Sequence, residues 1–173
     1  MRPETLLDFM GVAEHLKCNM RHSRMTDHRR ESVAEHTYRL CVFAWLVKEE
    51  FPDCDMDKVM KMCLFHDLGE ALTGDIPAFV KTDDDRKTEG DALTLLTAML
   101  PGKERQELDE LFGELEREET MEAKIVHVCE PELKEEFDPA VYDEQVGMME
   151  MVLDVDDIVD EMSAIRDEYC KYL

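Results

Sequence analysis

The sequence has 173 residues with 43 acidic and 20 basic side chains, which gives a formal net charge of −23 at pH 7. The phosphate backbone of DNA or RNA repels so acidic a chain, and a nucleic-acid polymer is therefore not expected as a partner. Because 44% of the residues are hydrophobic, the chain can still bury a core. We expect one domain over residues 1–173 rather than a disordered acidic tail.

The excess of acidic residues lies in the second half of the chain. Residues 1–80 carry 10 basic and 14 acidic side chains, whereas residues 81–173 carry 10 and 29. Five of the six histidines also fall in the first half. We therefore expect the chemistry of the protein within about residues 14–80, and an acidic, helical part over residues 81–173.

No apolar stretch approaches the length of about 18 residues that a membrane span needs. The first residues also lack the basic start and apolar run of a signal peptide. The sequence therefore predicts a cytoplasmic protein without a membrane partner.

Apolar residues recur at intervals of three and four along almost the whole chain, which is the period of a helix. Glycine and proline clusters separate the periodic segments. This pattern predicts an all-α fold that needs no strand. We expect helices near residues 3–18, 32–50, 55–68, 84–99, 103–117, 120–129 and 141–171.

The second predicted helix begins in the string ESVAEH. Ser32 can cap this helix, and Glu35 follows at the spacing of a capping box. His36 then projects from the first turn of an apolar helix. A histidine in this position is more often a half-buried core residue than a ligand, unless a second cluster of ligand-type residues accompanies it.

The third predicted helix ends in such a cluster, within MCLFHDLGEALTGDIPAF at residues 62–79. His66 and Asp67 supply one imidazole nitrogen and one carboxylate oxygen, a mixed set that suits Mn, Fe, Co, Ni or Zn better than Ca. Glu70 follows about one turn after His66, so both face the same site. Asp75 follows Gly74 and would by itself be an ordinary turn aspartate.

Three ordered blocks, HLKCNMRHS, ESVAEH and HDLGEALTGDIP, resemble the HD-domain phosphohydrolases, and within them the YfbR-like 5'-deoxynucleotidases. The resemblance covers about residues 14–80. It implies a helical bundle with a metal site between core helices. It also implies that a divalent metal ion serves the removal of phosphate from a small-molecule substrate, a deoxyribonucleoside monophosphate. Relatives are often dimers, so the resemblance carries a homodimer as an expectation.

The resemblance implies that His36, His66 and Asp67 are metal ligands and that a later aspartate completes the set. One candidate is Glu130, at the position that matches the family's distal aspartate, but Pro131 would break the helix there. The other is Asp156, which borders the apolar face of the last predicted helix. We favour Asp156 over Glu130, with Asp157 third because it points away from that face.

The resemblance also implies three roles toward the substrate. Glu70 would be the acid or base that handles the proton of the attacking water, and Arg21 would bind the phosphate with its forked set of donors. Asp75 matches the position that contacts the nucleoside sugar. Relatives usually carry a tryptophan shortly after the arginine, whereas this chain has His22. This difference bears on phosphate orientation and substrate preference.

Three other functions compete with a nucleoside monophosphate phosphohydrolase. The first is another HD-domain hydrolysis, on a cyclic or pyrophosphorylated nucleotide. The second is a degenerate HD module that binds a nucleotide without turnover. The third is an acidic helical interaction protein, in which the histidines would have no chemical role.

Overall fold

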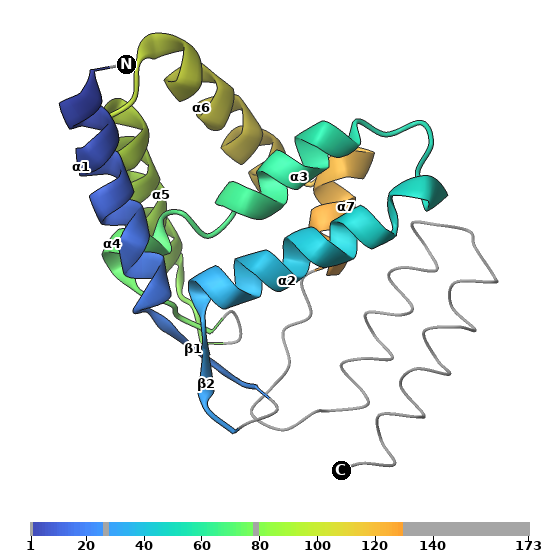
Figure 1. Cartoon of the computed structure of the whole chain (residues 1–173), viewed down its shortest axis with the longest axis horizontal. Coiled ribbons are helices and arrows are strands. Elements are labelled where there is room, and N and C mark those ends of the chain that lie inside the picture. Colours follow the sequence, from blue (N-terminus) through green and yellow to red (C-terminus); the bar gives the residue numbers. More distant parts are fainter. Residues whose placement is uncertain (1, 26–27, 78–79, 130–173) are drawn as a thin grey trace.

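The computed structural model describes residues 2–25, 28–77 and 80–129, and these residues form a mostly helical fold (Figure 1). The predicted all-α class is confirmed, and the helix expected at 141–171 lies outside the described residues. No helix in the described ranges is long and apolar enough to cross a membrane. The helices are α1 (Pro3–Ala13), α2 (Val33–Leu46), α3 (Met56–Phe65), α4 (Glu70–Thr73), α5 (Asp83–Ala98), α6 (Gly102–Arg117) and α7 (Met121–Cys129), with short 3-10 helices η1 (Glu14–Lys17) and η2 (Lys48–Glu50).

The centre of the core lies among α2, α3 and α7, which contact one another in all three pairs. Each of these helices buries residues at helical spacing, which is the pattern that predicted them. The α3 residues Val59, Met62 and Cys63 are fully buried, as are Val33 and Ala44 of α2. This packing fixes the end of α3 against the start of α2, where the motif histidines lie.

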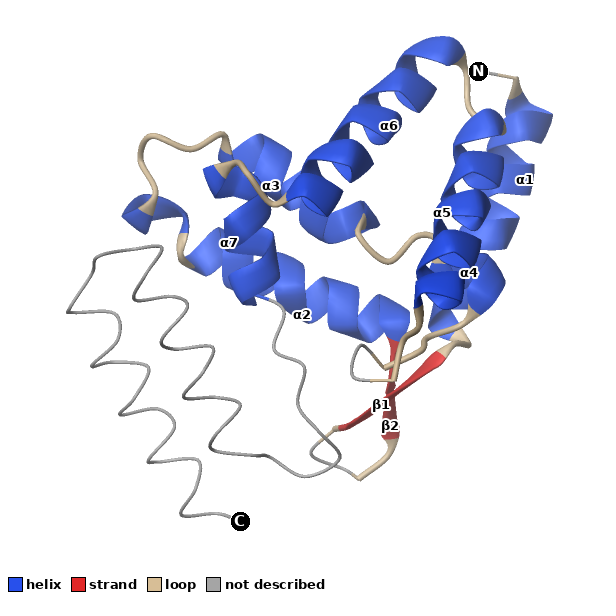
Figure 2. Ribbon diagram, turned by 180° about the vertical axis from the view of Figure 1, so that it is seen from behind, coloured by secondary structure: helices blue, strands red, loops and turns tan. Residues whose placement is uncertain are grey.

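A second group of helices closes one side of this core. Helix α5 contacts α4 and α6, and α6 contacts α3 and α7. Figure 2 shows α5 and α6 from the face opposite to that of Figure 1. The short α4 contacts α5, α1 and η1, and it carries Glu70 at its first position.

A small antiparallel hairpin joins η1 to α2, so the expectation that no strand is needed was wrong for this segment (Figure 2). Its strands are β1 (Met20–Arg24) and β2 (Arg30–Ser32). The register shifts between Met20 and Arg24, and these polar strands show no regular apolar alternation. Because strand formation depends on the pairing partner, the sequence pattern gave little signal for it.

The start of α2 has the predicted capping box. The Ser32 hydroxyl accepts a hydrogen bond from the backbone N–H of Glu35, and the Glu35 carboxylate accepts one from the N–H of Ser32 at 2.9 Å. Such caps contribute about 1 kcal/mol to helix stability. The cap fixes where α2 begins, and thereby where His36 stands relative to the end of α3.

Candidate active site

Three predicted metal ligands meet at the junction of α2 and α3. His36 projects from the first turn of α2, and His66 and Asp67 follow directly after α3. The Nε2 atom of His66 lies 3.0 Å from Oδ2 of Asp67 and 3.4 Å from Nε2 of His36. Nε2 of His36 lies 3.9 Å from the same Asp67 oxygen. The structure thus brings one ligand atom from each residue to a common point.

A backbone hydrogen bond orients the ring of His66, and burial favours the neutral form of His36. His66 Nδ1 donates a hydrogen bond to the carbonyl of Cys63 at 2.8 Å, which turns Nε2 toward Asp67. A backbone carbonyl on the other ring nitrogen is the usual support of a ligating histidine. His36 is 2% exposed, and burial, together with the charge of Arg21, lowers its pKa to about 3. Its ring is therefore neutral at pH 7 and keeps a nitrogen lone pair.

The spacing of these atoms fits a transition-metal ion. Metal bonds of about 2.0–2.2 Å to nitrogen and oxygen leave neighbouring ligand atoms roughly 3–3.5 Å apart, close to the separations found here. Two imidazoles and one carboxylate also suit Mn, Fe, Co, Ni or Zn. An ion bound by three protein ligands still has open coordination positions for a further ligand, water or substrate. The predicted fourth ligand, Asp156, and its alternatives Glu130 and Asp157 lie outside the described residues.

Arg21 is a buried cation that lies beside this cluster. It lies on β1 with only 3% of its surface exposed. Its Nη1 atom is 3.3 Å from Oδ2 of Asp67 and 3.5 Å from Oδ1 of Asp75. The hairpin therefore delivers a buried guanidinium to the site, with carboxylates of two loops around it.

Glu70 and Asp67 are neighbouring carboxyl groups with opposite pKa shifts. Burial and the charges of Asp67 and Asp75 raise the pKa of Glu70 to about 10. Burial works against ionisation of Asp67 too, but the contacts with His66 and Arg21 outweigh it and hold that pKa below its usual range. Glu70 Oε2 is buried and has no hydrogen-bond partner within the described part of the chain. One carboxyl group is thus protonated at neutral pH and the other ionised, a division typical of acid–base sites.

The turn after α4 places Asp75 in the same site. Gly74 adopts a φ of 77°, in the left-handed region that favours glycine, and its N–H donates to the carbonyl of Glu70 at 2.8 Å. The Asp75 side chain is nearly buried. Burial raises its pKa, although the nearby guanidinium of Arg21 opposes the shift.

All these groups except His36 line one pocket of 470 Å³. The pocket also holds two features that the sequence did not reveal. One is an ion pair between Lys81 and Glu89, whose side chains are largely buried. The other is an apolar wall contributed by α5, α6 and α7. These residues lie up to 60 positions beyond the motif and have ordinary helix-core spacing, so no local pattern distinguishes them from core residues.

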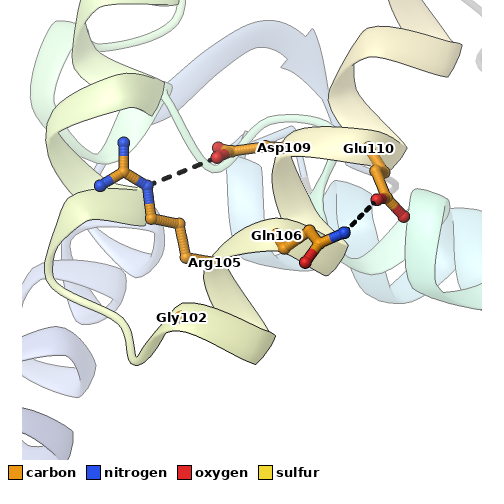
Figure 3. Close-up of a pocket in the computed structure, with 5 residues that line it drawn as sticks. All are labelled: Gly102, Arg105, Gln106, Asp109 and Glu110. Carbon is orange, nitrogen blue, oxygen red and sulfur yellow. Dashed lines mark hydrogen bonds and ion pairs between the residues drawn. The ribbon is translucent and has the colours of Figure 1, made fainter.

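A separate hollow at the start of α6 is lined by residues of that one helix, and its polar side chains pair with one another (Figure 3). It is lined by five residues of that helix: Gly102, Arg105, Gln106, Asp109 and Glu110. Its polar groups are paired along the helix, with Arg105 Nε 3.4 Å from Asp109 and Gln106 donating to Glu110 at 2.8 Å. Such pairs one turn apart are ordinary helix-surface contacts.

Comparison with known proteins identifies the family to which this chain belongs. The family model described as the HD domain matches residues 13–154, so the chain belongs to the HD-domain family. Among curated proteins, the human 5'-deoxynucleotidase HDDC2 is 36% identical over 100 residues, which are 57% of this chain and 48% of HDDC2.

Solved structures share the fold. A protein from Magnetospirillum magnetotacticum described as a predicted metal-dependent phosphohydrolase superposes with a TM-score of 0.78 over 98% of this chain and 93% of its own, at 23% identity. A conserved hypothetical protein from Pyrococcus furiosus superposes with a TM-score of 0.60 over 72% of this chain and 75% of its own, at 28% identity.

A second likeness concerns a shorter stretch of the chain. Component A of the glycine/sarcosine/betaine reductase complex from Peptoclostridium litorale is 59% identical over 49 residues, which are 28% of this chain and 31% of that protein. The chain thus spans less than a third of component A and about half of HDDC2.

Proposed function

We propose that this HD-domain protein is a metal-dependent phosphohydrolase that removes phosphate from (deoxy)nucleoside 5'-monophosphates. The observation that carries the proposal is the meeting of His36, His66 and Asp67 next to a buried arginine and a buried glutamate. The name of the human relative, a 5'-deoxynucleotidase, supports the substrate class.

In this proposal, His36, His66 and Asp67 hold one divalent ion, with Asp156 as the fourth protein ligand. An ion held there would supply Lewis-acid chemistry, that is, a lower pKa for a bound water molecule and polarisation of the phosphoryl oxygen. The pairing of His66 with the Cys63 carbonyl holds the ring in place. The mixed nitrogen and oxygen donors favour Mn, Co, Fe, Ni or Zn.

Arg21 and Glu70 carry the remaining steps. The guanidinium of Arg21 lies between Asp67 and Asp75, so a phosphate that enters the pocket meets a preformed set of donors. The carboxyl group of Glu70, whose pKa is raised by burial, can give its proton to the leaving 5' oxygen, and the carboxylate that remains can then accept the proton of the attacking water. Asp75 can accept a hydrogen bond from a sugar hydroxyl.

Phosphate release from a panel of nucleotides tests this proposal. The purified full chain would be supplied in turn with Mn, Co, Zn and Mg and with ribo- and deoxyribonucleoside monophosphates. We expect release from monophosphates with at least one transition metal. Release only from cyclic or pyrophosphorylated nucleotides would instead favour another HD hydrolysis. Nucleotide binding with bound metal and no release from any substrate would identify a module without turnover and contradict the proposal.

Other expectations about partners and place in the cell stay predictions. A small-molecule nucleotide is the proposed partner, without a nucleic-acid polymer or a membrane. The homodimer rests on the family resemblance, and sedimentation of the full chain would test it. Cytoplasmic location is likewise a prediction.

A further inference from the structure

The pocket lined by His66, Asp67 and Arg21 extends well beyond the groups needed to bind a phosphate. It begins at His66, Asp67 and Glu70 and continues between α5, α6 and α7. Its volume of 470 Å³ lies in the range of small-molecule sites, which is about 300–1,000 Å³. A phosphate and a sugar at the Arg21 end would leave the far part of this space for another group.

Three helices give this pocket an apolar wall. Ala123 and Val126 of α7 line it and are almost fully buried, and Phe112 and Leu115 of α6 and Leu93 of α5 line it and are partly buried. We call these five residues the apolar wall. Partly buried apolar side chains around a pocket stabilise a flat apolar group by removing its surface from water, and an aromatic ring adds a preferred stacking geometry.

Helix α5 leaves room for such a group. Gly90 lines the pocket, and a Cβ atom at this position would have no neighbouring atom within 4 Å. Glycine in the middle of a helix costs about 1 kcal/mol relative to alanine. Open space therefore lies beside the apolar wall at a position where helix stability alone would favour a side chain.

The charges along the pocket give the substrate a direction. Arg21 Nη1 lies 3.3 Å from Asp67 Oδ2, next to the ligand cluster. Glu116 near the end of α6 and Glu118 directly after that helix follow the wall residue Leu115 in the chain and also line the pocket. Their carboxylates disfavour a phosphate beside the apolar wall, so a phosphate is drawn to Arg21 and the wall is left to an uncharged part of the ligand.

We infer that the apolar wall and the open space at Gly90 form the binding site for the base of the nucleotide. This inference rests on the proposed function and deepens it. The phosphate occupies the metal and Arg21 end, the sugar lies near Asp75, and the base stacks in the far part of the pocket against Phe112.

A comparison of two substrates tests the inference. dAMP and 2-deoxyribose 5-phosphate share the phosphate and the sugar, and only dAMP has a base. For the native chain we expect a lower KM for dAMP. Phe112→Ala removes the stacking partner and Gly90→Leu fills the open space, so each should raise the KM for dAMP by about 3- to 10-fold or more, with a much smaller effect on 2-deoxyribose 5-phosphate.

A control variant separates base binding from general damage. Leu95→Ala truncates a leucine of the same helix that is 65% exposed and does not line the pocket. It should keep the native ratio between the two substrates. Because Phe112 packs against the core, Gly90→Leu is the variant that tests the site if Phe112→Ala does not fold.

The possible results are distinguishable. Equal losses on both substrates, or no preference for dAMP in the native chain, would overturn the inference and leave the proposed function standing. If the native chain hydrolyses neither substrate, the proposed function fails. Calorimetry with deoxyadenosine then decides on the pocket: binding that Gly90→Leu weakens and Leu95→Ala does not would support the base site, and no binding would overturn it.

Discussion

The Nε2 atoms of His36 and His66 lie 3.4 Å apart, although 30 positions separate the two residues. One ring comes from the capped start of α2 and the other from the end of α3. Because α2 and α3 pack along each other, their opposite ends in sequence meet at one point. With Asp67 beside them, the two rings form the centre on which the proposed chemistry depends.

Loss of one of these rings should abolish metal binding. We expect the purified chain to contain about one transition-metal ion, and His66→Ala to lose it, because the substitution removes one of the four proposed protein ligands and leaves an incomplete set. His127→Ala is the matched control, since that histidine has a half-exposed side chain outside the cluster. Elemental analysis of the dialysed proteins provides the measurement. Equal metal content in native protein and His66→Ala would refute the metal site.

The choice of the fourth ligand can be tested in the same way. We predict that Asp156→Asn weakens metal affinity by about 10-fold or more, whereas Glu130→Gln and Asp157→Asn have smaller effects. Competition with a chromogenic chelator would give the three affinities. A larger loss in Glu130→Gln would assign the role to that residue. No loss in any of the three would show that the ion is held without a ligand from this set.

Glu70→Gln should separate catalysis from metal binding. The substitution keeps the shape of the buried side chain and removes its transferable proton, so we expect full metal content and a fall in kcat of about 100- to 10,000-fold. Glu104→Gln, in the exposed first turn of α6, serves as the control. A fully active Glu70→Gln protein would show that another group moves the proton.

Arg21→Ala should act mainly on substrate binding. Loss of a charge-assisted, forked contact to the phosphate is expected to raise KM by roughly 10-fold or more, with a smaller change in kcat. Arg105→Ala, on the exposed surface of α6, should leave both constants unchanged. Steady-state kinetics on one monophosphate are sufficient. Native KM together with a strongly reduced kcat would mean that Arg21 acts in the transition state rather than in binding.

The ion pair between α3 and α6 predicts a pH-dependent contribution to stability. Lys58 Nζ lies 2.8 Å from Glu114 Oε1. Burial works to raise the pKa of Glu114, but hydrogen bonds from Lys58 and Thr120 outweigh it, so this pKa lies below the usual 4.5. A lowered carboxyl pKa stabilises the fold above the unfolded value, and the stabilisation is lost as the pH falls through the folded value.

Glu114→Gln should therefore lower Tm at pH 7, by an amount that corresponds to at most about 1 kcal/mol for a partly exposed pair. The difference from the native protein should shrink as the pH falls below about 4.5. Glu110→Gln removes an exposed carboxylate of the same helix and should show no such trend. Thermal unfolding at several pH values is the measurement, and a difference between native protein and Glu114→Gln that is constant from pH 7 to pH 3 would contradict the assignment.

Much of this fold could be predicted because it depends on local spacing. The apolar period of three and four residues predicted each described helix except the single turn of α4, and Ser32 and Glu35 marked the start of α2 by their capping spacing. The sequence also indicated that His36, His66 and Asp67 belong to one site. The family resemblance depends on residue types in a fixed order, and that order can be seen without a structure. Helix formation and capping involve neighbours within four positions, so the sequence displays them directly.

Only the tertiary structure decided what surrounds that site. The hairpin that carries Arg21 depends on pairing between β1 and β2, and the apolar wall joins Leu93, Phe112 and Val126 from three helices. The raised pKa of Glu70 likewise comes from burial and from charges on other segments. The sequence by itself determined the helices and the ligand types. Distances between segments far apart in the chain determined the pocket, because packing of the whole core sets them and no local pattern encodes them.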